Sequence, residues 1–295
     1  MIGRRGFLAV AGGAALLAAT RVGAADKGFS GAKGLRDGMA ALERRSGGRL
    51  GVSVHDTGSG RRFGWRADEM FPMCSTFKFL LAAAILRRVD EGRESLDRRI
   101  PVTPADMVPY APFTETRLNG PAPTVAELCE STMTLSDNVA ANLLLPAVGD
   151  PAGLTAFVRT LGDRHTRLDR NEPTLNSAIP GDPRDTTTPD AIIHSMERLM
   201  IGDALRPASR EQLIHWMVAN KTGDKRLRAG LTPGWRVGDK TGTGNGSFND
   251  IAIVWPTGKP PVLIACYLAQ TPKGFKDGDT IHAEVARAVA GALNG

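Results

Sequence analysis

The sequence predicts an α/β fold of the α+β sandwich type. It combines a five-stranded antiparallel sheet, built from both chain ends with flanking helices, and an inserted all-helical domain. Three observations support this prediction: two strand-like segments precede a long helical stretch, three follow it, and the connections within each group are short. Short connections favour antiparallel pairing, so the economical arrangement joins both groups in one sheet.

Composition places the chain among ordinary globular proteins. Its 295 residues are 42% hydrophobic and 23% charged, which excludes wholesale disorder and a coiled coil. The net charge is +6, and it falls to +3 without the three arginines that precede the first acidic residue. Because no contiguous basic block accompanies this charge, we expect a small soluble ligand and no nucleic-acid partner.

The first residues have the form of an export signal. Arg4 and Arg5 precede a modestly apolar run at 7–19 and small residues up to Ala24 and Ala25. That run is too short for a membrane span, which needs about 20 residues. We therefore expect a twin-arginine signal peptide at residues 1–25, cleaved after Ala24 or Ala25. The mature protein would be periplasmic or secreted, with no membrane contact.

The α/β domain is expected to be discontinuous, from residues 26–66 and 221–295. Leu35, Met39 and Leu42 lie at helical spacing and predict a helix over 34–45. Strands are expected at 50–55, 62–65, 235–240, 250–255 and 262–268, and a final amphipathic helix at 280–293.

Residues 67–220 are expected to form the all-helical domain. The predicted helices are 77–89, 125–129, 138–145, 154–161, 189–200 and 210–218. Residues 163–190 form a long polar stretch, and such loops inside compact domains are usually functional. We expect a functional loop at 170–185 and a ligand site in the crevice between the two domains.

A nucleophile is predicted where the most hydrophobic helix begins. Apart from Lys78, residues 77–86 are apolar nearly all round, which is typical of a buried helix. A spacing of three residues puts the Ser75 hydroxyl and the Lys78 amine on one face. A lysine drawn into a buried site can lose its proton and activate the serine.

Two further motifs gain weight from their order and context. Ser136-Asp137-Asn138 lies just before a predicted helix, and Lys240-Thr241-Gly242 closes a predicted strand. Each motif has a duplicate elsewhere, so a single match proves nothing. The duplicate at 30–33 lies near the mature N-terminus, and the one at 221–223 lies in a loop after a helix.

The ordered set, with Glu172-Pro173-Thr174-Leu175-Asn176 in the polar loop, resembles the penicillin-recognising serine acyltransferases and, within them, the class A β-lactamases. Ser136 follows Ser75 by 61 residues, Glu172 follows Ser136 by 36, and Lys240 follows Glu172 by 68. These spacings are close to those typical of the family, and the resemblance covers the whole mature chain.

The resemblance implies hydrolysis of penicillin- and cephalosporin-type β-lactams, and hence antibiotic resistance. Ser75 would attack the lactam carbonyl, with either Lys78 or a water held by Glu172 as the base. Ser136 would return a proton to the departing nitrogen. Backbone N–H groups of Ser75 and Thr243 would hold the oxyanion.

The same resemblance assigns the loop to deacylation. Glu172 and Asn176 would direct the water that hydrolyses the acyl-enzyme. The Glu172-Pro173 bond is either cis, which would point the carboxylate inward, or part of an ordinary turn. Arg170 and Asp185 resemble the family's closing salt bridge.

Substrate-binding positions also follow from the resemblance. They are Asn138, Lys240, Thr241, Gly242, Thr243, Arg226 and Tyr110. Lys240 would act as a compact charge on the substrate carboxylate, and Asn138 would bind the side-chain amide. Some members support that carboxylate with an arginine that is absent here at 248–250, and Arg226 resembles a substitute. Tyr110 would flank the cleft.

The three cysteines allow one disulfide or none. By resemblance, Cys74 and Cys129 occupy positions that form disulfides in some relatives. Gly244 and Ala82 replace the respective partners, so Cys74 is expected to be a buried thiol.

No cofactor and no metal are expected, because the five histidines show neither HxH nor HExxH spacing. We expect a monomer whose partners are β-lactam substrates and lactamase inhibitors. A D-alanyl-D-alanine peptidase and a non-catalytic penicillin sensor are the alternatives, and the deacylating pair Glu172 and Asn176 argues against both.

Overall fold

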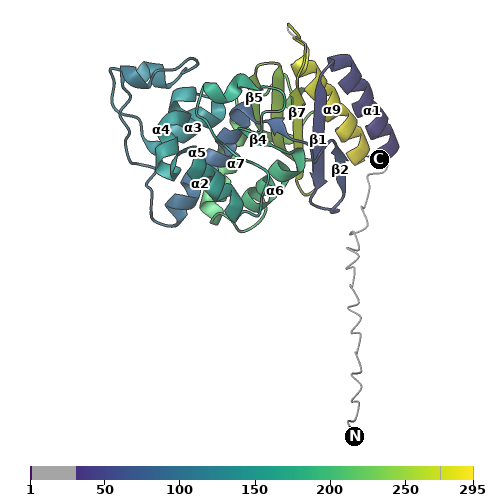
Figure 1. Ribbon diagram of the computed structural model, residues 1–295, viewed down its shortest axis with the longest axis horizontal. Coiled ribbons are helices and arrows are strands. Elements are labelled where there is room, and N and C mark those ends of the chain that lie inside the picture. The colour runs from purple at the N-terminus through teal and green to yellow at the C-terminus, as the bar shows by residue number, and fades with distance from the viewer. Residues whose placement is uncertain (2–30, 273, 295) are drawn as a thin grey trace.

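The computed structural model describes Met1 and residues 31–272 and 274–294. The predicted signal peptide lies outside the described residues. The described part of the chain forms the predicted sandwich around one five-stranded antiparallel sheet of order β2-β1-β7-β6-β5 (Figure 1). The strands are β1 (Arg49–Asp56), β2 (Arg62–Trp65), β5 (Arg236–Gly244), β6 (Ser247–Trp255) and β7 (Val262–Ala269). Pairing of β1 with β7 joins the two ends of the chain, as predicted.

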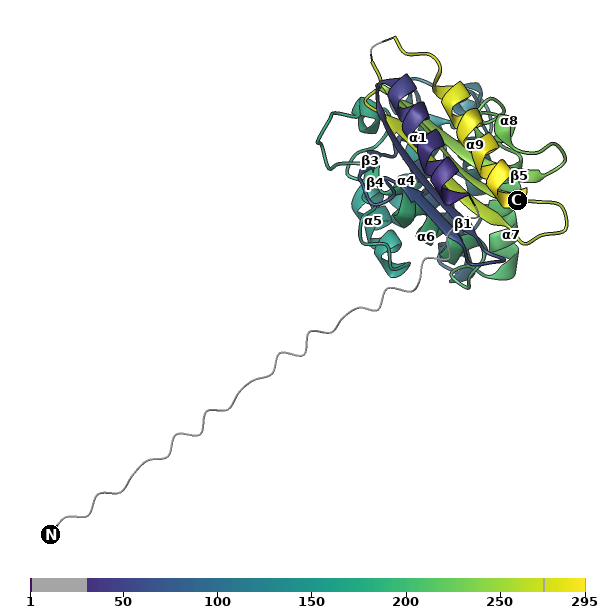
Figure 2. The ribbon, with the colours of Figure 1, turned by 90° about the vertical axis from the view of Figure 1, so that its right-hand side faces the viewer.

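One face of the sheet is covered by the two terminal helices. Helices α1 (Ala32–Ser46) and α9 (Gly278–Asn294) lie side by side across it, with the short helix α8 (Leu227–Gly230) next to α9 (Figure 2). Met39 of α1 and Val285 of α9 pack with Leu50 and Ile264 of the sheet in one apolar core.

The other face carries the helical layer, seen at the left of Figure 1. Its helices are α2 (Phe77–Asp90), α3 (Val125–Thr134), α4 (Asn138–Val148), α5 (Asp150–Thr160), α6 (Pro189–Met200) and α7 (Pro207–Val218). Short 3-10 turns lie at η1 (Cys74–Thr76), η2 (Pro104–Asp106), η3 (Thr114–Arg117) and η4 (Thr174–Ser177). Within the described ranges no single helix is long and apolar enough to cross a bilayer.

Strand β7 contributes side chains to the apolar cores on both faces of the sheet. All eight of its residues are buried. Leu263 and Tyr267 belong to the core under the helical layer, whereas Ile264 and Leu268 belong to the core under α1 and α9. Successive side chains of a strand point to opposite faces, so a continuous apolar run marks a central strand covered on both sides.

Three features differ from the sequence prediction. A two-residue ladder pairs β3 (Phe71–Pro72) with β4 (Thr186–Thr187), within the region expected to be all-helical. Helix α8 was not predicted, and both elements are too short to show periodicity. The strands predicted at 235–240 and 250–255 are longer than expected, because β5 continues to Gly244 and β6 begins at Ser247. The division into domains stays a prediction.

All three cysteines are buried and free. The sequence left open either one disulfide or none, and the structure has none among these three cysteines.

Candidate active site

The predicted nucleophile lies at the junction between η1 and the buried helix α2. Ser75 is the middle residue of η1 and only 8% of its surface is exposed. Cys74 before it has φ 46°, a left-handed conformation that is uncommon for a residue with a side chain. Backbone outliers of this kind gather at active sites.

Ser75 opens onto a cavity of about 320 Å³ between β5, the helical layer and the polar loop. The described residues that line it are Ser75, Tyr110, Ser136, Asn138, Asn176, Thr222, Arg226, Thr241, Gly242 and Thr243. All of them except Thr222 were predicted site residues. Thr222 belongs to the duplicate motif at 221–223, and its hydroxyl lies 2.5 Å from that of Thr241.

Glu172 is the hub of the buried part of the site. Its Oε1 accepts a hydrogen bond from the Ser75 hydroxyl at 3.0 Å and lies 3.0 Å from Lys78 Nζ. The sequence left two bases open, Lys78 or a water held by Glu172, whereas here the serine contacts the carboxylate directly. Glu172 can therefore accept the hydroxyl proton without an intermediary.

Lys78 is fully buried, and its amine meets several oxygen atoms. Besides Glu172, its Nζ donates to Asn138 Oδ1 at 2.6 Å and to the Ser136 carbonyl at 2.8 Å. Burial lowers the pKa of Lys78, while the Glu172 carboxylate opposes that shift. Loss of the proton is thus easier than for an exposed lysine.

Ser136 lies between two lysines. Its hydroxyl accepts a hydrogen bond from Lys240 Nζ at 3.0 Å, and Lys78 Nζ lies 3.5 Å away. The pKa of Lys240 is lowered well below its usual range by burial and by repulsion from Lys78. A hydroxyl placed between two such amines can relay a proton.

Asp137, the middle residue of the second motif, has a structural role that sequence reasoning missed. Its carboxylate caps α4 through Ala140 N and accepts hydrogen bonds from the backbone and hydroxyl of Thr114. Aspartate before a helix is a known capping signal, so the pattern could have revealed it. The cap holds Ser136 and Asn138 on either side.

Two asparagines hold Glu172. Asn176 Nδ2 donates to Glu172 Oε2 at 2.5 Å. Asn142 of α4 donates to the Glu172 carbonyl at 2.9 Å and accepts from its backbone N–H at 3.0 Å. The sequence predicted Asn176 but gave no signal for Asn142. The Glu172-Pro173 bond is cis, one of the two alternatives left open.

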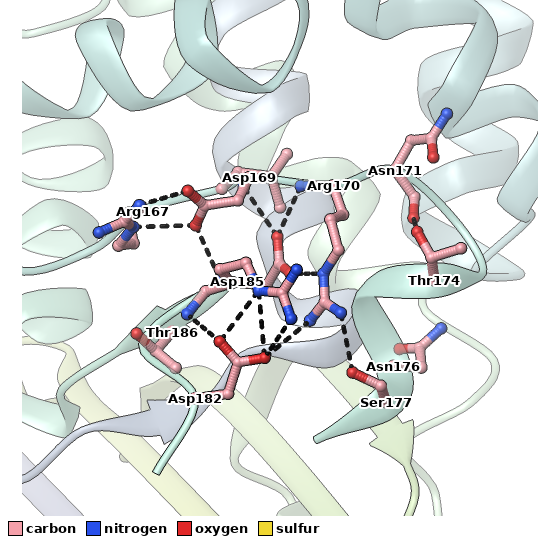
Figure 3. Close-up of polar contacts among 12 residues, drawn as sticks. Arg167, Asp169, Arg170, Asn171, Thr174, Asn176, Ser177, Asp182, Asp185 and Thr186 are labelled. Atoms are coloured by element: carbon pink, nitrogen blue, oxygen red, sulfur yellow. Dashed lines mark hydrogen bonds and ion pairs between the residues drawn. The ribbon is translucent and has the colours of Figure 1, made fainter. Parts of the chain in front are cut away.

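The polar loop is closed by the predicted pair at its two ends. Arg170 Nε lies 2.6 Å from Asp185 Oδ2, and Asp185 Oδ1 also accepts the backbone N–H groups of Asp169 and Arg170 (Figure 3). Arg170 reaches Ser177 inside the loop as well. These bonds span both ends and the middle of the loop, and so fix the segment that carries Glu172.

Arg226 supports the far side of the cavity through an arrangement the sequence could not show. Its guanidinium donates to the carbonyls of Gly242 and Asn249 and to the Thr243 hydroxyl, the last at 2.6 Å. Asp279 pairs with its Nε at 2.8 Å. Arg226 thus reaches the predicted carboxylate site both directly, as a lining residue, and through Thr243.

Two glycines allow β5 to approach the nucleophile. A Cβ built on Gly242 would lie 2.7 Å from the Met73 carbonyl and 3.1 Å from Ser75 N. A Cβ on Gly244 would lie 2.7 Å from Cys74 Sγ.

Tyr110 is 60% exposed at the rim of the cavity.

A larger cleft of about 1210 Å³ lies on the other side of the loop segment 171–172. Its lining includes Arg88, Glu94, Ser95 and Arg98, and the Ser95 hydroxyl accepts a hydrogen bond from Asp97 N. The smaller cavity holds the nucleophile and is therefore the candidate site. Among the described residues no group of three or more His, Cys, Asp or Glu side chains could hold a metal ion.

Fold and site together indicate a class of protein: a hydrolase whose cavity gathers a serine, two lysines and a carboxylate carried by a loop. A model of the "Beta-lactamase enzyme family" matches residues 34–293. The chain belongs to this family and, within it, to class A.

Individual relatives agree with this assignment. The chain is 47% identical to a β-lactamase of Streptomyces albus G, covering 98% of this chain and 97% of the relative. It is 49% identical to β-lactamase L2 of Stenotrophomonas maltophilia, covering 84% and 82%. A solved structure of an ancestral class A β-lactamase, GNCA, is 59% identical, with a TM-score of 0.86 over 88% of this chain and 99% of that chain.

Proposed function

We propose that this class A β-lactamase opens the cyclic amide of penicillin- and cephalosporin-type antibiotics through an acyl-enzyme on Ser75. Enzymes of this class hydrolyse β-lactams and confer resistance to them. The observation that carries the proposal is the position of Glu172 Oε1, within 3.0 Å of both Ser75 Oγ and Lys78 Nζ.

Acylation begins when Ser75 Oγ bonds to the lactam carbonyl carbon. The hydroxyl proton passes to Glu172 and from it to the free amine of Lys78, 3.0 Å away, so that Glu172 is a carboxylate again. The negative charge on the carbonyl oxygen is held by the backbone N–H groups of Ser75 and Thr243. When the carbon–nitrogen bond breaks, Ser136 passes a proton to the nitrogen and recovers one from its lysine neighbours.

Deacylation is assigned to Glu172 and Asn176 in the same cavity. A water held by Glu172 and Asn176 loses a proton to Glu172 and adds to the ester carbonyl. The bond to Ser75 Oγ breaks, and the serine takes the water's proton back from Glu172, which lies within hydrogen-bond distance of it. The short Asn176–Glu172 hydrogen bond supports this pairing, because it fixes the direction of the carboxylate.

Substrate orientation is assigned to both walls of the cavity. Lys240, Thr241 and Thr243 bind the substrate carboxylate with support from Arg226, while Asn138 binds the side-chain amide. Gly242 lets the substrate-binding end of β5 lie close to Ser75, and Tyr110 flanks the entrance. The same cavity would accept β-lactam-type inhibitors. The enzyme is also proposed to act as a monomer, and gel filtration tests this.

The test of the activity is incubation of the purified protein with a chromogenic cephalosporin. Sustained turnover that is lost in Ser75→Ala is the expected result. Slow turnover together with cleavage of D-alanyl-D-alanine peptides would indicate a peptidase instead. A single stoichiometric burst without turnover would indicate a penicillin sensor. Either of these last outcomes contradicts the proposal.

We also propose that residues 1–25 export the enzyme by the twin-arginine route to the periplasm or the medium. The support is the sequence pattern of Arg4 and Arg5 before an apolar run. Replacing both arginines with lysine is expected to leave active, uncleaved enzyme inside the cell. Unchanged export of the double variant would contradict the route.

A further inference from the structure

We infer that Asn249 is a positioning residue for acyl transfer. It fixes the nucleophile turn against β5, so that the two backbone donors of the oxyanion site keep their separation. The inference rests on the proposed function, because it concerns the same acylation step. Asn249 occupies the stretch after the Lys240 motif where the expected arginine is absent.

The contacts of Asn249 are directed at the segment before the nucleophile. Its side chain is fully buried in β6, and its Nδ2 donates to the Pro72 carbonyl at 2.8 Å and to the Met73 carbonyl at 3.0 Å. Two carbonyl acceptors require a donor, so the amide nitrogen must face them. Residues 72 and 73 lead directly into Cys74 and Ser75.

The neighbours of Asn249 across the sheet contact the same segment. Asn249 lies opposite Gly242 of β5 and Tyr267 of β7 in the strand register. Gly242 approaches the Met73 carbonyl and Ser75 N, and the Tyr267 hydroxyl lies 3.1 Å from Thr76 Oγ1. Three strands thus present one row of residues to the nucleophile turn, and Asn249 makes the central link.

Packing alone does not account for an asparagine at this point. Its Oδ1 is buried and has no hydrogen-bond partner, and burying an unpaired amide oxygen is unfavourable. An apolar side chain would avoid that cost. What asparagine adds, and an apolar residue lacks, is the pair of hydrogen bonds to the backbone of the nucleophile turn.

The link matters because the two proposed oxyanion donors belong to different elements. Ser75 N lies in η1, and Thr243 N lies in β5. An oxyanion is stabilised only when both donors stand at hydrogen-bond distance from one point in space. Cys74 with φ 46° shows that the turn is held in an uncommon conformation, and Asn249 is the side chain that ties its approach to the sheet.

The test compares Asn249→Leu, which keeps similar size without the donor, with the parent enzyme. Ile253→Ala, on the same face of β6, is the matched control for lost core stability. The measurements are kcat/KM for a chromogenic cephalosporin, the affinity of a benzyl boronic acid as a tetrahedral analogue, and the infrared carbonyl band of the acyl-enzyme. The band is recorded in a Glu172→Gln background.

For Asn249→Leu we expect about a 10-fold fall in kcat/KM and a similar loss of boronic acid affinity. The acyl carbonyl band should move to higher frequency, because weaker hydrogen bonds polarise it less. Ile253→Ala should leave the band unchanged. Should Asn249→Leu not fold, Asn249→Ala carries the same comparison.

A folded Asn249 variant with the parent's carbonyl band and boronic acid affinity would overturn the inference. A purely structural residue would lower the melting temperature and leave both readouts in place. Absence of turnover in the parent enzyme is a different result: it contradicts the proposed function, not the role of Asn249.

Discussion

Lys240 donates a hydrogen bond to the hydroxyl of Ser136 at 3.0 Å, across 104 positions of the sequence. The contact joins β5, whose Thr241 and Gly242 line the cavity, to the segment just before α4, where Ser136 lines it as well. In the proposed mechanism this hydroxyl takes a proton from a lysine and passes it to the substrate nitrogen. Several predictions about the reaction depend on it and on its neighbours.

Ser136→Ala should slow acylation, because the departing nitrogen loses its proton donor. General acid catalysis of this kind contributes about 10²- to 10⁴-fold. We therefore expect a fall of at least 10²-fold in the pre-steady-state acylation rate, followed by stopped-flow absorbance with a chromogenic cephalosporin. No acyl-enzyme should accumulate in mass spectra. An acylation rate within threefold of the parent's would remove Ser136 from the proton path.

Glu172→Gln should have the opposite signature. The Glu172 charge raises the pKa of Lys78 against the effect of burial, so its removal favours the free amine, which can then serve acylation. Deacylation has no such substitute. Acyl-enzyme should therefore accumulate on Ser75, detected as a mass increase of one substrate, while steady-state turnover falls about 10²- to 10⁴-fold. Unchanged turnover would contradict the role of Glu172.

Arg226→Lys should weaken substrate binding more than the chemical step. Lysine cannot reproduce the fork of bonds to Thr243, Asp279 and the strand carbonyls. Losing a bond to a charged group corresponds to about a 10-fold rise in KM, with kcat little changed. Steady-state kinetics checks this split. A kcat loss at constant KM would place Arg226 in the chemistry instead.

Asp185→Asn should loosen the loop without changing its shape. The substitution weakens a buried carboxylate that Arg170 and two backbone N–H groups share. We expect the free energy of unfolding to fall by about 2 kcal/mol and deacylation to slow, since Glu172 lies on the same segment. Asp182→Asn is the control, because its carboxylate pairs with Arg184 at 2.8 Å and reaches Arg170 only at 4.0 Å. Equal effects of the two variants would argue against the closing pair.

The buried His282 should make the free energy of unfolding depend on pH in the acid range. Burial, reinforced by the charge of Arg226, lowers its pKa from 6.5 to about 4. Between these values the unfolded chain binds a proton that the native state does not, so stability falls as the pH falls. This group accounts for about 3 kcal/mol over that window.

Urea unfolding at pH 7, 5.5 and 4 measures the effect of His282. The variant His282→Gln should show a shallower decline than the parent. Parallel curves for parent and variant would show that other groups dominate the acid response.

The sequence was most informative where a pattern has a physical period or a fixed order. The five strands and the long helices follow from apolar periodicity, and the double burial of β7 explains its unbroken apolar run. The motifs of the site could be found because they follow one another in the order and at the spacings of the family that they resemble. The structure brings their side chains together, namely Ser75, Lys78, Ser136, Glu172 and Lys240.

The supporting residues could not be found in this way. Asn142, Thr222 and Asn249 act through side-chain contacts with distant backbone or hydroxyl groups. No local spacing encodes such contacts, because their partners are set by how the helical layer docks on the sheet. The ladder between β3 and β4 escaped prediction for the same reason, since two residues carry no period.

That small ladder has a mechanical consequence. Phe71 and Pro72 pair with Thr187 and Thr186, and Met73 N donates to the Asp185 carbonyl at 2.8 Å. The segment that leads into Ser75 and the C-terminal end of the loop that carries Glu172 are therefore hydrogen-bonded to each other. We expect that breaking this ladder, unlike loosening the loop alone, would displace Ser75 together with Glu172, so that acylation and deacylation would slow together.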